Sequence, residues 1–296
     1  MRPRGTRTVP GPGRPAARGL VAWAAVMAMV LMAAGCDSAA SRSGVPRPDH
    51  VVVVVEENRG YDQIIGSADA PYLNELALRG ASLTEFYAIT HPSQPNYLAM
   101  FAGSTLGVRN DSCPHTLTAR NLGSQLLQAD LTFAGYAQSM PRVGYTGCNS
   151  GAYARRHNPW VNFSNLPASV NRPWTDFPRA FEDLPTVSFV IPDLEHDMHD
   201  GSVRKADTWL RDNLGDYADW AMTHNSLLVV TWDEDESQGE LSNRIPTLLV
   251  GEGVKPGEHS QPNNLYGLLR TLLDAYDLEP LGHSADAEAL DVWTDG

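Results

Sequence analysis

The chain has 296 residues, of which 42% are hydrophobic and 19% are charged. These fractions are ordinary for a globular protein and exclude a chain that is disordered throughout. With 22 basic and 35 acidic residues the formal net charge is −13, and this acidic balance argues against nucleic acid as a binding partner.

The first 35 residues are typical of an export signal. Residues 2–18 contain five arginines and no acid, and a long apolar run then ends in the sequence LMAAGC at Cys36. A basic start, an apolar centre and small residues before a cleavage point are the features of a signal peptide. The ending is similar to a bacterial lipobox, in which Cys36 would be lipidated and become the N-terminus of the mature protein. A plain signal peptide is the alternative, so we expect a lipoprotein on the outer face of the cell membrane or a secreted protein.

Two segments follow the export signal. Residues 36–48 are small and polar and contain proline, so they are predicted to form a flexible tether. Residues 49–296 contain no internal repeat and are predicted to form one domain, and we expect a monomer. Cys113 and Cys148 are the only cysteines after Cys36, and an even pair in an exported chain favours a disulfide.

Apolar runs rich in β-branched residues predict four buried strands, at residues 50–58, 185–193, 225–235 and 244–254. Helical patterns occur between and around them, at residues 70–81, 121–130, 204–222 and 264–278. Alternation of strands and helices predicts a three-layer α/β domain.

Acidic residues stand at the ends of three of these strands. The first strand ends in Glu57-Asn58, the second ends in Asp193, and the third ends in Asp233-Glu234. Because the carboxyl ends of parallel strands meet at one edge of a sheet, we expect these side chains to converge there. Oxygen ligands together with imidazole suit a divalent cation, without distinguishing Ca²⁺, Mg²⁺ and Zn²⁺. The following residues, Asp235 and Glu236, are interpreted as solvated loop acids.

The stretch THPSQPN, residues 90–96, precedes a predicted helix that runs to Ala102. Pro95 suits the first turn of that helix, which places Ser93 at or just before its N-terminus. Backbone N–H groups and the helix dipole favour an anion at such an end, so a phosphate could be held there while Ser93 binds a metal. A bound metal would lower the pKa of the hydroxyl group and make it a nucleophile. The alternative is that Ser93 only caps the helix.

These motifs resemble the phosphoesterase family, which holds bacterial acid phosphatases and phospholipases C within the alkaline phosphatase superfamily. The resemblance covers residues 49–293 and is strongest toward mycobacterial secreted acid phosphatases that act on phosphatidylinositol 3-phosphate. It rests on the stretches VVVVVEENRGYDQIIG, THPSQPNYLAMFAGST, YARRHNPWVNFSN, HDMHDGS and VVTWDEDE. It implies an alkaline-phosphatase-like three-layer αβα sandwich with a mostly parallel central sheet.

The resemblance also implies the metal ligands. Glu57 and Asn58 match the metal-binding Glu-Asn pair of the family, and Ser93 matches the nucleophile that also contacts the metal. Asp233 and Glu234 match an Asp-Asp metal pair, and glutamate at the second position lengthens that ligand by one methylene group.

Other matching residues line the phosphate side of the family site. Three of them lie in the stretch HDMHDGS. Asp197 and His199 would contact the phosphate or a second metal, while His199 and Asp200 would be catalytic, with His199 as the favoured proton carrier. The family often has a histidine just before the last helix, but this chain has Leu265 there. His259 lies six residues earlier and could replace that histidine.

The segment ARRHNPW, residues 154–160, has two interpretations. It could place Arg155, Arg156 or His157 near an anionic substrate, or it could be a surface loop.

We therefore expect an exported, metal-dependent acid phosphatase that hydrolyses phosphomonoesters through a phosphoserine, with phosphatidylinositol 3-phosphate as a candidate substrate. One alternative is a phosphodiesterase of the phospholipase C type. The other is a non-catalytic lipoprotein that binds metal or phosphate, which the missing histidine at position 265 would explain. The expected partners are a small phosphomonoester or phosphoinositide and, through the lipid anchor, the membrane.

Overall fold

The computed structural model describes residues 44–236 and 243–294. The expected signal peptide, Cys36 and most of the expected tether lie outside these residues. Among the described residues, no helix is both long enough and apolar enough to cross a bilayer.

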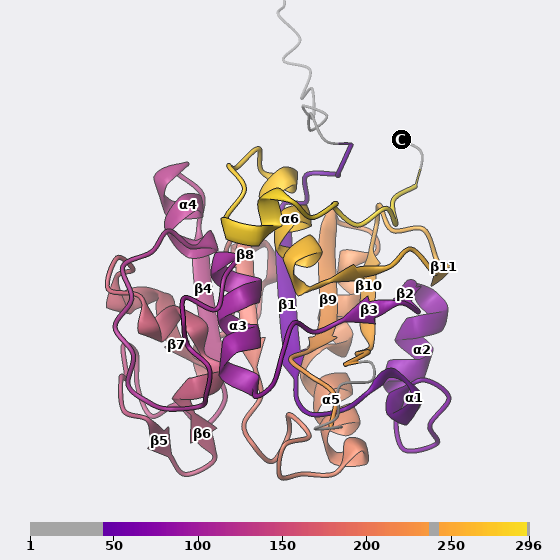
Figure 1. Cartoon of the computed structure of the whole chain (residues 1–296). Coiled ribbons are helices and arrows are strands. Elements are labelled where there is room, and N and C mark those ends of the chain that lie inside the picture. Colours follow the sequence, from indigo (N-terminus) through magenta and orange to yellow (C-terminus); the bar gives the residue numbers. More distant parts are fainter. Residues whose placement is uncertain (1–43, 237–242, 295–296) are drawn as a thin grey trace, which may run out of the picture. The chain divides into compact units, whose positions relative to one another are not determined.

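An eight-stranded sheet forms the middle layer, in the order β11-β2-β10-β9-β1-β8-β4-β7 (Figure 1). β1 (His50–Glu56) lies between β9 (Ser226–Trp232) and β8 (Val187–Ile191), and it is parallel to both. Only β10 (Thr247–Gly251) runs against its neighbours. The apolar runs of these strands are buried, as a sheet covered on both faces requires. The predicted mostly parallel sheet is confirmed.

The sheet also contains strands that the sequence pattern did not indicate. These are β2 (Ala81–Leu83), β4 (Phe133–Ala137), β7 (Asn171–Pro173) and β11 (Gly257–His259). Two small sheets accompany it, formed by β3 (Phe86–Tyr87) with β12 (Asn263–Asn264) and by β5 (Asn149–Ser150) with β6 (Tyr153–Ala154). Most of these strands are two or three residues long, too short to show an alternating pattern.

Helices cover both faces of the sheet (Figure 1). On one face α2 (Pro71–Arg79) packs against α5 (Val203–Ala221), and on the other α3 (Ser93–Ala102) packs against α6 (Leu265–Ala275) and α4 (Leu122–Gln128). A one-turn helix, α1 (Tyr61–Ile64), follows β1. This arrangement confirms the predicted three-layer αβα sandwich.

Short 3₁₀ helices occupy much of the chain between β6 and β8. They are η1 (Arg155–His157), η2 (Pro159–Asn162), η3 (Ala168–Val170), η4 (Trp174–Asp176) and η5 (Phe181–Asp183), and η6 (Gly282–Ala285) follows α6. The expected disulfide between Cys113 and Cys148 is present, with a Cα–Cα distance of 5.9 Å. It joins the loop after α3 to the segment before η1.

Helix α3 is buried along its whole length. Its Phe101 ring lies 5.4 to 5.7 Å, between ring centroids, from the rings of Phe133 on β4, Phe163 after η2 and Phe189 on β8. Aromatic pairs at this spacing contribute about 0.5–1.5 kcal/mol each beyond their area burial. The contacts fix α3 against the sheet and thereby fix the position of Ser93 at its first turn.

Candidate active site

Four carboxylates from distant parts of the chain meet at the carboxyl edge of the sheet. Glu57 follows β1, Asp197 follows β8, and Asp233 and Glu234 follow β9; none is more than 2% exposed. The backbone N–H of Glu57 donates to the carbonyl of Asp197 (2.7 Å), and the backbone N–H of Asn58 donates to Asp233 Oδ1 (3.1 Å). The structure therefore brings the three strand ends together, as a parallel sheet should.

Ser93 faces this cluster from the first turn of α3. Its Oγ lies 3.1 Å from Glu57 Oε2 and 3.2 Å from Glu234 Oε1. The loop before the helix is fixed by Asn96, whose Oδ1 accepts from the N–H groups of Ile89 and Thr90 at 3.0 Å. The odd composition of THPSQPN thus has a structural reason, since the asparagine ties the loop to the helix that carries the serine.

The first turn of α3 offers fewer amide donors than the sequence suggested. The N–H of Gln94 donates to Asp111 Oδ1 at 2.9 Å, and Pro95 has no N–H. An anion at this helix end therefore competes with Asp111 for donors. Positive charge from other side chains becomes more important for holding a phosphate.

The residues at this edge fit a divalent cation. Burial, reinforced by the neighbouring carboxylates, raises the pKa values of Glu57 and Asp233 well above their usual range, and burial raises the pKa of Glu234 to about 8. Asp233 Oδ2 has no hydrogen-bond partner among the described residues. Buried carboxylates of this kind need a compensating charge, and oxygen ligands suit a hard cation.

A buried histidine completes the cluster. His157, 1% exposed, places Nε2 3.1 Å from Glu57 Oε1 and Nδ1 3.3 Å from Asp197 Oδ2, and its ring stacks on Tyr97 at 5.4 Å. Burial, with the nearby charges of Arg156 and His199, lowers the pKa of His157 well below its usual value, so the ring is neutral and able to bind metal. Ligand atoms of Glu57, His157 and His199 lie within 4.8 Å of one another, which makes them a possible metal-binding triad.

His199 is held on three sides at the rim of the site. Its N–H donates to Asp197 Oδ1 (2.8 Å), its Nδ1 lies 2.7 Å from Asp200 Oδ1, and its Nε2 lies 3.2 Å from Arg156 Nη2. Of the two interpretations of the 154–160 segment, the structure favours the one near the site for Arg156 and His157.

One histidine at the site was not singled out from the sequence. His91 places Nδ1 2.5 Å from Glu234 Oε2 and Nε2 3.8 Å from Asp235 Oδ1. The available signal was its position two residues before Ser93 in THPSQPN. Asp235 is also 7% exposed and therefore differs from the solvated acid that we expected.

The structure does not bring His259 to this cluster. His259 ends β11 at the sheet border, where β2 and β10 separate that strand from β9, and its Nε2 lies 2.9 Å from the carbonyl oxygen of Lys255. Leu265, at the position of the family histidine, is fully buried at the start of α6. The geometry therefore gives no support to His259 as a replacement, and it places His91 and His157 at the site instead.

A model of the phosphoesterase family matches residues 67–279. The chain belongs to the phosphoesterase family. The predicted class of enzyme, a phosphoric ester hydrolase, is confirmed by this membership.

Two relatives of this phosphoesterase differ in how much of their length it covers. The chain is 47% identical to a phosphatidylinositol-3-phosphatase of Mycobacterium tuberculosis, over 93% of this chain and 90% of the relative. It is 30% identical to a probable acid phosphatase of Kluyveromyces lactis, over 81% of this chain but only 61% of that protein. The predicted similarity to phosphomonoesterases is thus confirmed.

Solved structures show the same fold at low sequence identity. A Vibrio parahaemolyticus protein of the alkaline phosphatase superfamily superposes with a TM-score of 0.57 at 14% identity, over 82% of this chain and 71% of that one. The phosphonate monoester hydrolase of Agrobacterium radiobacter gives 0.56 at 13% identity, over 82% and 76%. The phosphoesterase therefore has the expected alkaline-phosphatase-like fold.

Proposed function

We propose that this phosphoesterase is an exported, divalent-metal-dependent acid phosphatase that forms a phosphoserine at Ser93. The observation that carries the proposal is the position of Ser93 Oγ, 3.1 Å from Glu57 Oε2 and 3.2 Å from Glu234 Oε1, on a helix buried against the sheet. The substrates named for the relatives favour a phosphomonoester, with phosphatidylinositol 3-phosphate as the candidate.

In this proposal the metal is held by Glu57, Asn58, Ser93, Asp233 and Glu234. A bound divalent cation supplies charge stabilisation for the phosphoryl oxygens and lowers the pKa of a hydroxyl group next to it. The carboxylates suit Ca²⁺ or Mg²⁺, and His157 suits Zn²⁺.

Ser93 is the proposed nucleophile. Its proton passes to Glu234 Oε1 and returns to Ser93 when the phosphoserine is hydrolysed, while Glu234 Oε2 lies 2.5 Å from His91 Nδ1. Ser93 Oγ then attacks phosphorus in line with the leaving oxygen, the P–O bond to the alcohol breaks, and the phosphoryl group is transferred to Ser93.

Two further residues assist both halves of the reaction. His199 gives a proton to the departing alcohol, and in the second half it takes a proton from the water that hydrolyses the phosphoserine. Asp200, 2.7 Å from His199 Nδ1, orients the imidazole. Arg156 forms no ion pair among the described residues, so its guanidinium is available to the phosphate.

A metal-repletion assay tests this function. Chelated enzyme is assayed with p-nitrophenyl phosphate, bis-p-nitrophenyl phosphate and phosphatidylinositol 3-phosphate, before and after each divalent metal is restored. We expect monoester hydrolysis only with metal, and hydrolysis of the diester about 100-fold slower. Faster hydrolysis of the diester would support the phospholipase C type instead. No turnover of any ester would support a non-catalytic binding protein.

We further propose that residues 1–35 are a lipoprotein signal peptide, that 36–48 are a tether and that 49–296 are the catalytic domain. The lipobox-like LMAAGC supports this organisation. Fractionation of cells that express Cys36→Ser tests it, because loss of the lipid should move the protein from the membrane fraction to the soluble fraction. A variant that stays in the membrane fraction would argue against a lipid at Cys36.

A further inference from the structure

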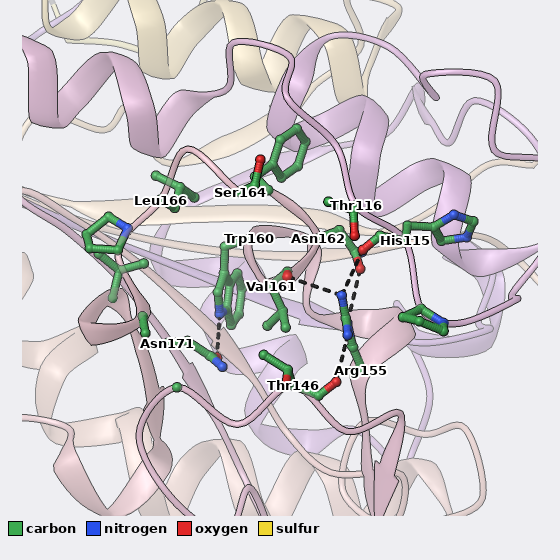
Figure 2. Close-up of a pocket in the computed structure, with 16 residues that line it drawn as sticks. His115, Thr116, Thr146, Arg155, Trp160, Val161, Asn162, Ser164, Leu166 and Asn171 are labelled. Atoms are coloured by element: carbon green, nitrogen blue, oxygen red, sulfur yellow. Dashed lines mark hydrogen bonds between the residues drawn. The ribbon is translucent and has the colours of Figure 1, made fainter.

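Figure 2 shows a second cavity, whose lining includes none of the carboxylates of the catalytic cluster. Its volume is about 330 Å³, and its walls come from residues 114–116, 144–146 and 155–171. The Cys113–Cys148 disulfide joins the segments that contribute the first two walls. The disulfide therefore links two of the segments that form the cavity, and all of its lining residues belong to the described part of the chain.

Arg155 brings a buried positive charge to this cavity. It is 5% exposed, and its guanidinium donates to Asn162 Oδ1 (3.1 Å) and to the carbonyl oxygens of Thr146 (2.6 Å), His115 (2.9 Å) and Val161 (3.3 Å), as the dashed lines in Figure 2 show. All of these acceptors are neutral. Within the described ranges Arg155 forms no ion pair, whereas the half-buried Arg270 is paired with an aspartate. An unpaired buried charge is costly, so an anion in the cavity would be stabilising.

A second polar group in the cavity wall lacks a partner. Asn162 is 2% exposed, and its Nδ2 makes no hydrogen bond to any described residue. Its Oδ1 is already used by Arg155 Nε, so the amide donor is the group left over. An unused donor next to an unpaired cation adds to the preference for an anionic ligand.

Part of the remaining wall is apolar. The Trp160 indole N–H is satisfied by Asn171 Oδ1 at 2.8 Å and the side chain is only 1% exposed, so the accessible carbon comes from neighbours such as Val161 and Leu166. Leu166 and Val170 line the same space. A small hydrophilic anion would leave these walls uncovered, whereas an anion that carries hydrocarbon would cover them.

We propose that this cavity binds an anionic phospholipid, with its phosphodiester against Arg155 and its glycerol and first acyl carbons against Val161 and Leu166. The cavity adjoins the active site because η1 carries Arg155 into it and directs Arg156 and His157 toward the catalytic cluster. Lipid bound here would hold the enzyme at a membrane surface where lipid phosphates occur. That use rests on the proposed function, but the binding itself requires no turnover.

The proposal is tested by binding to the full chain in solution. The probe is dihexanoylphosphatidylglycerol below its critical micelle concentration, measured by titration calorimetry. The comparison ligands are the zwitterionic dihexanoylphosphatidylcholine and the chain-free glycerophosphoglycerol. We expect the probe to bind at least about tenfold more tightly than either one. Equal binding of the two lipids would overturn the anionic site, and equally tight binding of glycerophosphoglycerol would overturn the lipid site.

Ala168 allows a matched pair of variants. It is exposed and lines the cavity, so a longer side chain there fits without disturbing the core. Ala168→Glu should weaken binding of the probe about tenfold, whereas the isosteric Ala168→Gln should change it by less than about threefold. Equal effects of the two variants would overturn the role of charge.

The readouts separate this inference from the proposed function. Circular dichroism confirms that both variants fold, and the comparison of ligands on the unaltered chain needs no variant. Absence of p-nitrophenyl phosphate turnover by the unaltered chain would count against the proposed function. Absence of saturable binding of the probe, with turnover intact, would count against the lipid site alone.

Discussion

His199 is oriented by its neighbours at the rim of the site. Asp200 lies against Nδ1, and the Arg156 guanidinium lies against Nε2. In the proposed reaction, substrate phosphate draws Arg156 away, and Nε2 then faces the phosphoryl group. This geometry suits a group that carries a proton to and from oxygen.

A His199→Asn variant should therefore affect poor leaving groups most. Glycerol phosphate needs a proton on its departing alkoxide, and we expect kcat/KM to fall about 100-fold. p-Nitrophenolate leaves without a proton, so the loss with p-nitrophenyl phosphate should be below about tenfold. The measurement is kcat/KM for both esters with wild type and variant. Equal losses would show that His199 does not act as the proton donor.

The buried carboxylates also set the pH dependence of stability in the metal-free protein. Burial raises the pKa of Glu234 to about 8 and that of Asp197 to about 7. In the unfolded chain such groups titrate near 4. Between these values the folded state binds more protons than the unfolded state, so the free energy of unfolding falls as pH rises.

We therefore expect the Tm of chelated protein to fall as pH is raised from 5 to 8. Added divalent metal replaces the protons, so it should raise Tm more at pH 8 than at pH 5. Differential scanning calorimetry with and without metal measures both effects, and Glu234→Gln is the control that should reduce the slope. A Tm of the chelated protein that is constant or rises over this range would contradict the assignment of these acids.

At the scale of elements, η1 links two sites because consecutive residues point to different surroundings. Arg155 faces the second cavity, while Arg156 and His157 face the catalytic cluster. The disulfide lies next to η1, because the carbonyl oxygen of Cys148 accepts a hydrogen bond from the backbone N–H of Arg155 at 2.9 Å. The covalent link therefore supports the element that serves both sites.

Removing the disulfide should lower stability. Cys113 and Cys148 are 35 residues apart, and a closed loop of that length stabilises by about 3–4 kcal/mol on a chain-entropy estimate. The double variant Cys113→Ser/Cys148→Ser should lose about that free energy of unfolding in urea. The unaltered chain in strong reductant is the matched control. A loss below about 1 kcal/mol in both cases would mean that the native contacts alone hold this loop.

At the scale of the whole molecule, the sequence indicated the long elements and the residues attached to their ends. The strand-end positions of Glu57 and Asp233 are readable because a parallel sheet gathers its carboxyl ends at one edge. β4 could not be predicted from the sequence, because FAGYA shows no alternation of polar and apolar residues. Its Gly135 reflects tertiary packing, since a Cβ added there would lie 2.1 Å from the Trp160 ring. His157 was uncertain because it lies on a three-residue helix whose direction only tertiary packing decides.

We propose that the hydroxyl group of Ser93 accepts the phosphoryl group above a cluster of buried acids. Acid quench of the metal-loaded enzyme during turnover of p-nitrophenyl phosphate, followed by peptide mapping by mass spectrometry, tests it most directly. We expect phosphate on Ser93 in the unaltered chain, none in Ser93→Ala, and turnover about a thousandfold lower in that variant. Phosphate on another residue, or turnover by Ser93→Ala within a few-fold of the unaltered chain, would contradict it.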